Sequence, residues 1–205
     1  MSYIKSPVQI LTRKIISKDE ALKIDYPVII GMEDKSVMEK MNKKIKELVY
    51  ELIKQQGYYE QENMTMNGWY EIKTNERGVL SISIGNYAYP YHAAHGMTVI
   101  KSLNFNISTG KNFELYELFK PNSNFVKEIS EMIELQIKER GITLLDTFKG
   151  ISPNQDYYIA DKCLVVYFQL YEIAAYVYGI LDFPISIYSI QNIIDNDGLL
   201  GVMLM

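Results

Sequence analysis

The stretch YAYPYHAAHGMTVIKSLNFNISTGK, residues 87–111, decides the fold of this 205-residue chain. It begins with a tyrosine-rich loop that holds both histidines, His92 and His95. The run MTVIKSLNFNI follows, and its β-branched and aromatic residues predict a strand. The sequence Ser-Thr-Gly-Lys at residues 108–111 then predicts a turn. This part of the chain therefore predicts an aromatic loop carried by a sheet.

The residues before this stretch predict more sheet. The runs WYEIKT and VLSISIG, residues 69–74 and 79–85, flank the turn Asn75-Glu76-Arg77-Gly78, in which the glycine can take a positive φ. VLSISIG alternates strictly between polar and apolar residues, which predicts a strand with one buried face. Two further runs rich in β-branched residues, VQILTRKII and LKIDYPVII, predict strands near the N-terminus.

Two segments predict amphipathic helices. Residues 34–56 carry apolar side chains at helical spacing, and Ser36 and Glu39 fit a capping box. Residues 124–140 repeat the helical spacing, and Gly141 after them is typical of a helix C-terminus.

Strand-like runs return after the second helix, as DYYIAD, CLVVYFQL and FPISIYSI. Because strands and helices are segregated with few crossovers, we expect an α+β fold with antiparallel or mixed sheets and two long helices. We expect two small intertwined subdomains, one of residues 1–60 and one of residues 61–205.

Composition excludes several classes of protein. The net charge is −4 and the lysines are dispersed, so a nucleic-acid partner is not expected. No run approaches about 18 apolar residues, so we expect no membrane-spanning helix. Cys163 is the only cysteine, which leaves no intrachain disulfide, and it lies in an apolar run that predicts a buried strand.

The compartment and the oligomeric state stay open. The first twenty residues lack an apolar signal-peptide core with a cleavage site, so we expect a cytoplasmic protein, or a cell-surface one if an export segment was removed. The apolar tail NIIDNDGLLGVMLM, residues 192–205, has three interpretations: a last strand, a contact in a homodimer, or a cloning remnant. A packed terminal strand is the favoured one.

The histidines and one carboxylate are the candidates for chemistry. His92 and His95 form His-x-x-His, but a zinc site needs further ligands and the loop contains no acidic residue. Glu172 lies between apolar strand residues, so we expect it to be partly buried at a strand end. It could act as a general acid or base, or as a structural carboxylate that accepts backbone hydrogen bonds. No Gly-x-Ser-x-Gly, His-Glu-x-x-His or Walker motif occurs, so we expect neither an enzyme nor a cofactor.

Four motifs, in order, carry a resemblance to a known family. They are Ala94-His95-Gly96, the run FNISTGK at residues 105–111, Leu118-Phe119, and CLVVYFQLYEIAAYVYG at residues 163–179. In them the chain resembles the domain shared by the C-terminal region of the anti-sigma factor RsiV and the non-catalytic part of the peptidoglycan deacetylase PdaC. Residues 8–56 resemble the companion N-terminal domain of that family.

The resemblance implies an α+β fold and a non-catalytic role in recognising a cell-envelope ligand, either a protein such as lysozyme or a cell-wall glycan. It also implies which residues form the structural motif of the domain: Gly96, Gly110, Tyr171, Glu172 and Gly179. The chain departs from the family pattern where His92-Ala93 replaces two glycines and Ala175 replaces a proline.

The aromatic loop is the candidate binding surface, since loops on a rigid scaffold commonly carry function. Its candidate ligand-binding residues are Tyr87, Tyr89, Tyr91, His92 and His95. Two alternatives remain: a metal-dependent hydrolase that uses His92 and His95, and a cytoplasmic structural protein.

Overall fold

The computed structural model describes residues 7–61 and 63–204. The chain divides into two compact units, and unit 1 ends at Asn112 while unit 2 begins at Phe113. The boundary expected between residues 60 and 61 falls inside unit 1, because the strands that follow it pair with the strands before it. In their described residues, unit 1 combines a β-sheet with one long helix and unit 2 combines a β-sheet with several helices, so the expected α+β class is confirmed.

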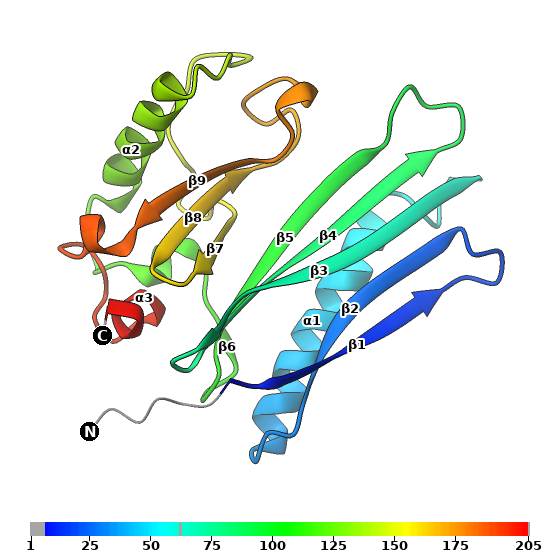
Figure 1. Ribbon diagram of the computed structural model, residues 1–205, viewed down its shortest axis with the longest axis horizontal. Helices are drawn as coiled ribbons and strands as arrows, with labels where there is room; N and C mark the ends of the chain where they lie inside the picture. The colour runs from blue at the N-terminus through cyan, green and yellow to red at the C-terminus, as the bar shows by residue number, and fades with distance from the viewer. Residues whose placement is uncertain (1–6, 62, 205) are drawn as a thin grey trace. The chain divides into compact units, whose positions relative to one another are not determined.

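Unit 1 contains one six-stranded sheet whose strands lie in chain order (Figure 1). Neighbouring strands are antiparallel, except that β2 and β3 are parallel where Leu22–Ile24 pairs with Met66–Gly68. The sheet is therefore mixed, as expected. Its strands are β1 (Gln9–Ile16), β2 (Leu22–Ile30), β3 (Met64–Glu76), β4 (Val79–Pro90), β5 (Met97–Asn106) and β6 (Lys111–Asn112).

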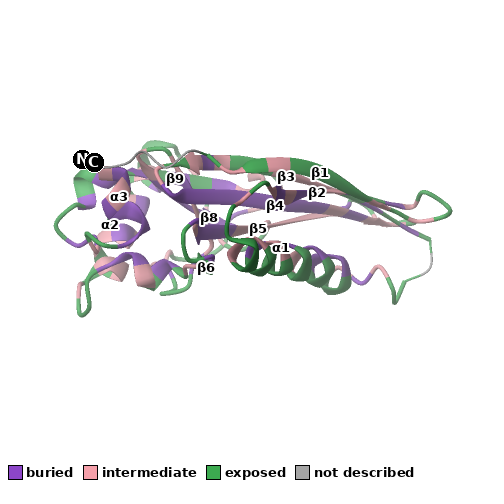
Figure 2. Ribbon diagram, turned by 90° about the horizontal axis from the view of Figure 1, so that it is seen from below, coloured by how far each residue is buried: buried purple, intermediate pink, exposed green. Residues whose placement is uncertain are grey.

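Helix α1 (Lys35–Gln55) covers one face of this sheet (Figure 2). Its N-cap is Asp34, whose carboxylate accepts a hydrogen bond from the N–H of Val37 at 3.0 Å. The capping box expected at Ser36 and Glu39 is therefore wrong, because an aspartate two residues earlier already supplies the cap. The apolar stripe of α1 is buried against the sheet, as its spacing predicts: Met41, Ile45, Val49, Leu52 and Ile53.

A side-chain amide fills the gap where β2 and β3 diverge beyond Ile24. Asn42 on α1 accepts a hydrogen bond from the N–H of Ile29 and donates one to its carbonyl, each at 2.8 Å. The amide thus replaces the strand neighbour that the backbone of β2 lacks at this point.

The hairpin between β3 and β4 has a two-residue turn, Arg77-Gly78. Both residues have positive φ, 52° for Arg77 and 80° for Gly78. A turn of this kind matches the right-handed twist of the flanking strands. The sequence predicts the hairpin and the positive φ of Gly78. The structure shows that Arg77 also has a positive φ, which is unfavourable for a residue with a side chain.

Unit 2 contains a three-stranded antiparallel sheet in the order β7-β8-β9 and the helix α2 (Phe125–Glu139). Helix α2 buries Ile129, Ile133 and Ile137, and Gly141 with φ 62° ends it as predicted. The remaining elements are β7 (Tyr157–Ala160), β8 (Cys163–Phe168), β9 (Leu181–Ser186), the 3-10 helices η1 (Leu115–Leu118), η2 (Tyr176–Tyr178) and η3 (Ile187–Ile190), and α3 (Leu199–Leu204).

Two sequence expectations in unit 2 are wrong. The tail forms α3 instead of a terminal strand, with Leu199, Leu200 and Met203 buried; leucine and methionine favour a helix over a strand. Strand β8 ends at Phe168, so Glu172 lies in a turn and is exposed. No helix in the described part of the chain is long and apolar enough to cross a membrane.

Candidate binding surface

Three connections meet at one end of the unit 1 sheet, and we call this end the tyrosine end. They are the β1–β2 turn at residues 17–21, the α1–β3 connection at residues 56–61 and 63, and the β4–β5 turn at residues 91–96. Figure 1 shows both hairpin turns at the same end of the sheet. The N–H of Tyr91 donates to the carbonyl of Asn63 at 3.0 Å, and the N–H of Met66 donates to the carbonyl of Ala21 at 2.7 Å. Backbone hydrogen bonds therefore fix the β4–β5 turn to the α1–β3 connection, and the β1–β2 turn to strand β3.

Tyr91 and His92 are the exposed aromatic pair of the β4–β5 turn. Tyr91 is 65% exposed, and its ring centroid lies 3.9 Å from that of His92. The turn below them is closed by two hydrogen bonds, from the N–H of Ala93 to the carbonyl of Pro90 and from the hydroxyl of Tyr89 to the carbonyl of Ala93. Two exposed rings, tilted by 51° to each other, thus lie in contact on a turn that is closed by its own hydrogen bonds.

The other three candidate residues have closer contacts with the sheet. Tyr87 and Tyr89 are half-buried, and the ring of Tyr87 lies against Gly96, where a Cβ would overlap it. His95 is exposed, and its Nδ1 lies 3.0 Å from the carbonyl oxygen of Gly96, to which it donates in the Nδ1–H tautomer. These contacts stabilise the turn that presents Tyr91 and His92.

A zinc site at His92 and His95 would need further ligands close to them. Across residues 7–61 and 63–204, no three His, Cys, Asp or Glu side chains gather so that they could hold a metal ion. His92 and His95 accordingly have no further ligands of these types there.

A hollow of about 420 Å³ lies beside Tyr91 at the tyrosine end. The sequence singles out only Tyr91 among its residues, because the others lie on the β1–β2 turn, the α1–β3 connection and the start of β3, which no motif links. The buried Met64 and several polar side chains are among them. The lining residues are Asp19, Ala21, Tyr58, Gln61, Asn63, Met64, Thr65 and Tyr91.

Asp19 is the charged residue among the described residues that line the hollow. Its Oδ1 accepts hydrogen bonds from the hydroxyl of Ser17 at 2.5 Å and from the N–H of Ala21 at 3.2 Å. The hydrogen bond from Ser17, with the weaker one from Ala21, lowers the pKa of Asp19 below its ordinary value. The carboxylate is therefore ionised at neutral pH.

The structural motif of the family lies at turns. Glu172 accepts hydrogen bonds from the side-chain amide of Gln155 at 2.8 Å and from the N–H of Gln169 at 2.6 Å. This arrangement agrees with the structural interpretation of Glu172, and its exposure does not agree with the expected partial burial. Tyr171, Gly110 and Gly179 have positive φ of 65°, 61° and 69°, which favours glycine at the last two.

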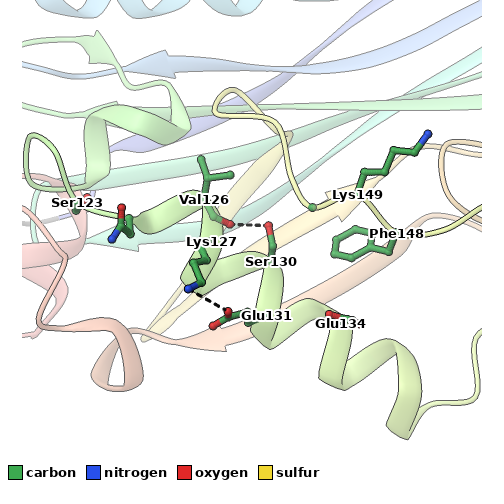
Figure 3. A pocket seen from close by; sticks show the side chains of 10 residues that line it. Ser123, Val126, Lys127, Ser130, Glu131, Glu134, Phe148 and Lys149 are labelled. Atoms are coloured by element: carbon green, nitrogen blue, oxygen red, sulfur yellow. Dashed lines mark hydrogen bonds and ion pairs between the residues drawn. The ribbon is translucent and has the colours of Figure 1, made fainter.

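Two hollows lie among the described residues of unit 2. The first, of about 490 Å³, lies between α2 and residues 148–150 (Figure 3). There Lys127 and Glu131 approach each other to 3.8 Å, and the hydroxyl of Ser130 donates to the carbonyl of Val126 and accepts from the N–H of Ile151. The second, of about 370 Å³, includes Glu172. The polar groups named here hydrogen-bond or pair with one another. Neither hollow is lined by a candidate residue of the aromatic loop.

Comparison with known proteins gives two family matches and no curated relative. A family described as a protein of unknown function, DUF3298, matches residues 116–188, and a family described as deacetylase PdaC matches residues 15–98. No curated protein matches the chain.

Two crystal structures of DUF3298 family proteins are similar in fold. One, from Bacteroides fragilis, has a TM-score of 0.67 at 10% identity and covers 98% of each chain. The other, from Pseudomonas aeruginosa, has a TM-score of 0.71 at 14% identity and covers 93% of this chain and 95% of that one. At such identities the likeness shows the fold alone.

The PdaC match lies within unit 1 and the DUF3298 match lies within unit 2. These matches and the structural neighbours support the domain family that the sequence resembles, with a PdaC-type region in unit 1 followed by a DUF3298-type region in unit 2.

Proposed function

We propose that this chain is a non-catalytic recognition domain of a bacterial cell-envelope system, and that the tyrosine end of unit 1 binds its ligand. The ligand is a lysozyme-like protein or a cell-wall glycan. The resemblance to the RsiV and PdaC domain suggests these two classes, and the family matches support the domain assignment.

The observation that carries the proposal is the exposed pair Tyr91 and His92. A 65% exposed tyrosine in contact with the tilted ring of a histidine leaves a large aromatic surface in water. Aromatic side chains held in this way are typical anchors of binding surfaces, because burying them releases water at a small cost in side-chain entropy.

The rigidity of the tyrosine end also supports binding. The hydrogen bond between Tyr91 and Asn63 joins two of its connections, and the Tyr89 hydroxyl closes the turn on Ala93. A surface ordered before binding loses less conformational entropy when a ligand docks. The net charge of −4 favours a basic protein among protein ligands, although a charge this small contributes mainly to the association rate.

Calorimetric titration tests the proposal. The chain is titrated with a c-type lysozyme and, separately, with soluble peptidoglycan fragments. Saturable heat with one of them is the expected result, and binding of lysozyme should weaken with added salt if charge steers it. Absence of heat with both ligands at high micromolar concentration would contradict the proposed function.

A further inference from the structure

We propose that the hollow beside Tyr91 is a saccharide site that takes a neutral pyranose ring, an inference that rests on the proposed recognition function and names the chemical class of its ligand. The hollow lies entirely within unit 1 and combines aromatic walls with short polar side chains. It offers about 420 Å³, near the lower end of the ~300–1,000 Å³ that ligand sites usually occupy.

The aromatic walls suit the apolar face of a sugar. Tyr91 comes from the β4–β5 turn and Tyr58 from the α1–β3 connection. Tyr58 packs against the core of unit 1 and meets Tyr59 edge-to-face at 5.5 Å, so its ring is held from two sides. The C–H groups on one face of a pyranose can stack on such rings, as other apolar surfaces do.

The polar groups around the hollow suit sugar hydroxyls. Gln61 and Asn63 carry amides that both donate and accept, Thr65 carries a hydroxyl, and Asp19 carries a carboxylate. A sugar hydroxyl is a donor and an acceptor at once, so a mixed set of this kind can satisfy several hydroxyls of one ring.

The charge of Asp19 disfavours an anionic ligand and is compatible with a neutral one. Asp19 is ionised at neutral pH, since the hydrogen bond from Ser17 lowers its pKa. An anionic ligand in contact with this carboxylate would be repelled, whereas a neutral hydroxyl can donate to it.

The hollow is formed before any ligand binds. Ala21 is fixed to β3 by the hydrogen bond from the N–H of Met66, and Asn63 is fixed to the β4–β5 turn by the hydrogen bond from the N–H of Tyr91. The N–H of Gln61 donates to the carbonyl of Gly57, which closes the turn after α1. Small, weakly binding ligands depend on such order, because they contribute little energy to organise a site.

The test uses the full chain and the trimer of N-acetylglucosamine as the probe. Amide chemical shifts are followed by NMR during the titration. Saturable shifts are expected at residues around the hollow, among them Ala21, Asn63, Thr65 and Tyr91. Ala21→Leu fills the hollow while it keeps the backbone hydrogen bonds of residue 21, and it should weaken binding by about tenfold or more.

Two further variants make the result specific. Thr147→Leu adds apolar volume to a hollow of unit 2 and should leave the affinity for the trimer unchanged. Thr65→Val keeps the β-branched shape of a strand residue and removes only the hydroxyl, so a several-fold loss of affinity is expected from a variant that should fold normally.

Shifts that are absent at millimolar trimer, or that survive both Ala21→Leu and Thr65→Val, would overturn the saccharide site. If lysozyme still bound the wild-type chain in that case, the recognition function would stand without it. If neither the trimer, lysozyme nor peptidoglycan fragments bound, both proposals would be overturned.

Discussion

The ring of Tyr87 lies against the backbone of Gly96, across the base of the β4–β5 turn. A Cβ built on Gly96 would overlap the Cζ, hydroxyl and Cε2 atoms of that ring, although Gly96 does not have a positive φ. The glycine at this position is required for space and not for backbone conformation. This contact explains physically why glycine ends the Ala94-His95-Gly96 motif.

Gly96→Ala should lower the free energy of unfolding by about 1–3 kcal/mol, the usual cost of an overpacked contact. The measurement is urea denaturation followed by circular dichroism. Combining Gly96→Ala with Tyr87→Ala removes the overlapping ring, so the two changes together should cost less than the sum of the separate changes. Strict additivity of the two would contradict the contact.

His92 should be under conformational strain, because its φ of 67° is unfavourable for a residue with a side chain. The family that the sequence resembles has glycine at this position. His92→Gly and His92→Ala both remove the ring, but only glycine relieves the left-handed backbone. The glycine variant should therefore be more stable than the alanine variant by about 1 kcal/mol.

Thermal and urea unfolding of the two His92 variants measure this difference. Ala94, which lacks a positive φ, provides the matched control, and Ala94→Gly should be destabilising. Equal stability of the His92→Gly and His92→Ala variants would show that the turn relaxes without strain.

Glu172→Gln should destabilise unit 2 without affecting binding at the tyrosine end. The carboxylate accepts from both Gln155 and the N–H of Gln169, and an amide presents only one acceptor oxygen to the two donors. The expected loss is about 1 kcal/mol in unfolding free energy. Denaturation and ligand titration are compared on the same variant; weakened binding at unchanged stability would assign Glu172 a functional role.

Ser17→Ala should raise the pKa of Asp19 toward its ordinary value, since the hydroxyl of Ser17 is the main cause of the lowered pKa. A carboxylate with a lowered pKa in the folded state stabilises that state above its unfolded pKa, and this contribution is lost as the pH falls through the folded pKa. The lowered pKa of Asp19 should therefore make wild type more stable than Ser17→Ala at neutral pH. This contribution to the difference should disappear in acid.

NMR titration of the Asp19 carboxyl carbon measures that pKa directly. Glu20 is the internal control, because the hydrogen bond from Lys23 lowers its pKa and is independent of Ser17. An unchanged pKa at Asp19 in the variant would show that the hydrogen bond is not made in solution.

Local patterns predict much of the fold. Helices α1 and α2 follow from apolar spacing, and the β3–β4 hairpin follows from Gly78 between two strand-like runs. Local patterns do not predict the division at Asn112, because it depends on the parallel pairing of β3 with β2, two strands that are distant in the sequence. The helix α3 could not be predicted with the same ease. A short apolar run fits a buried strand or a buried helix equally well, and here the leucines and methionines favour the helix.

The candidate site is predicted only in part. Tyr91 and His92 are evident from the sequence because aromatic residues cluster in one loop. Asp19, Tyr58 and Thr65 lie beside Tyr91 only because the β1–β2 turn, the α1–β3 connection and the start of β3 meet at one end of the sheet, and no local pattern encodes that meeting.

The most direct test of recognition at the tyrosine end compares two tyrosine variants against the ligand that binds in calorimetry. Tyr91→Ala removes a ring of the tyrosine end that is 65% exposed, and Tyr116→Ala removes a ring that is 50% exposed in unit 2. A central aromatic anchor typically contributes about 2 kcal/mol or more, so Tyr91→Ala should weaken binding about thirtyfold while Tyr116→Ala leaves it unchanged. Equal affinity of the Tyr91→Ala variant and the wild-type chain would contradict the proposal that this end binds the ligand.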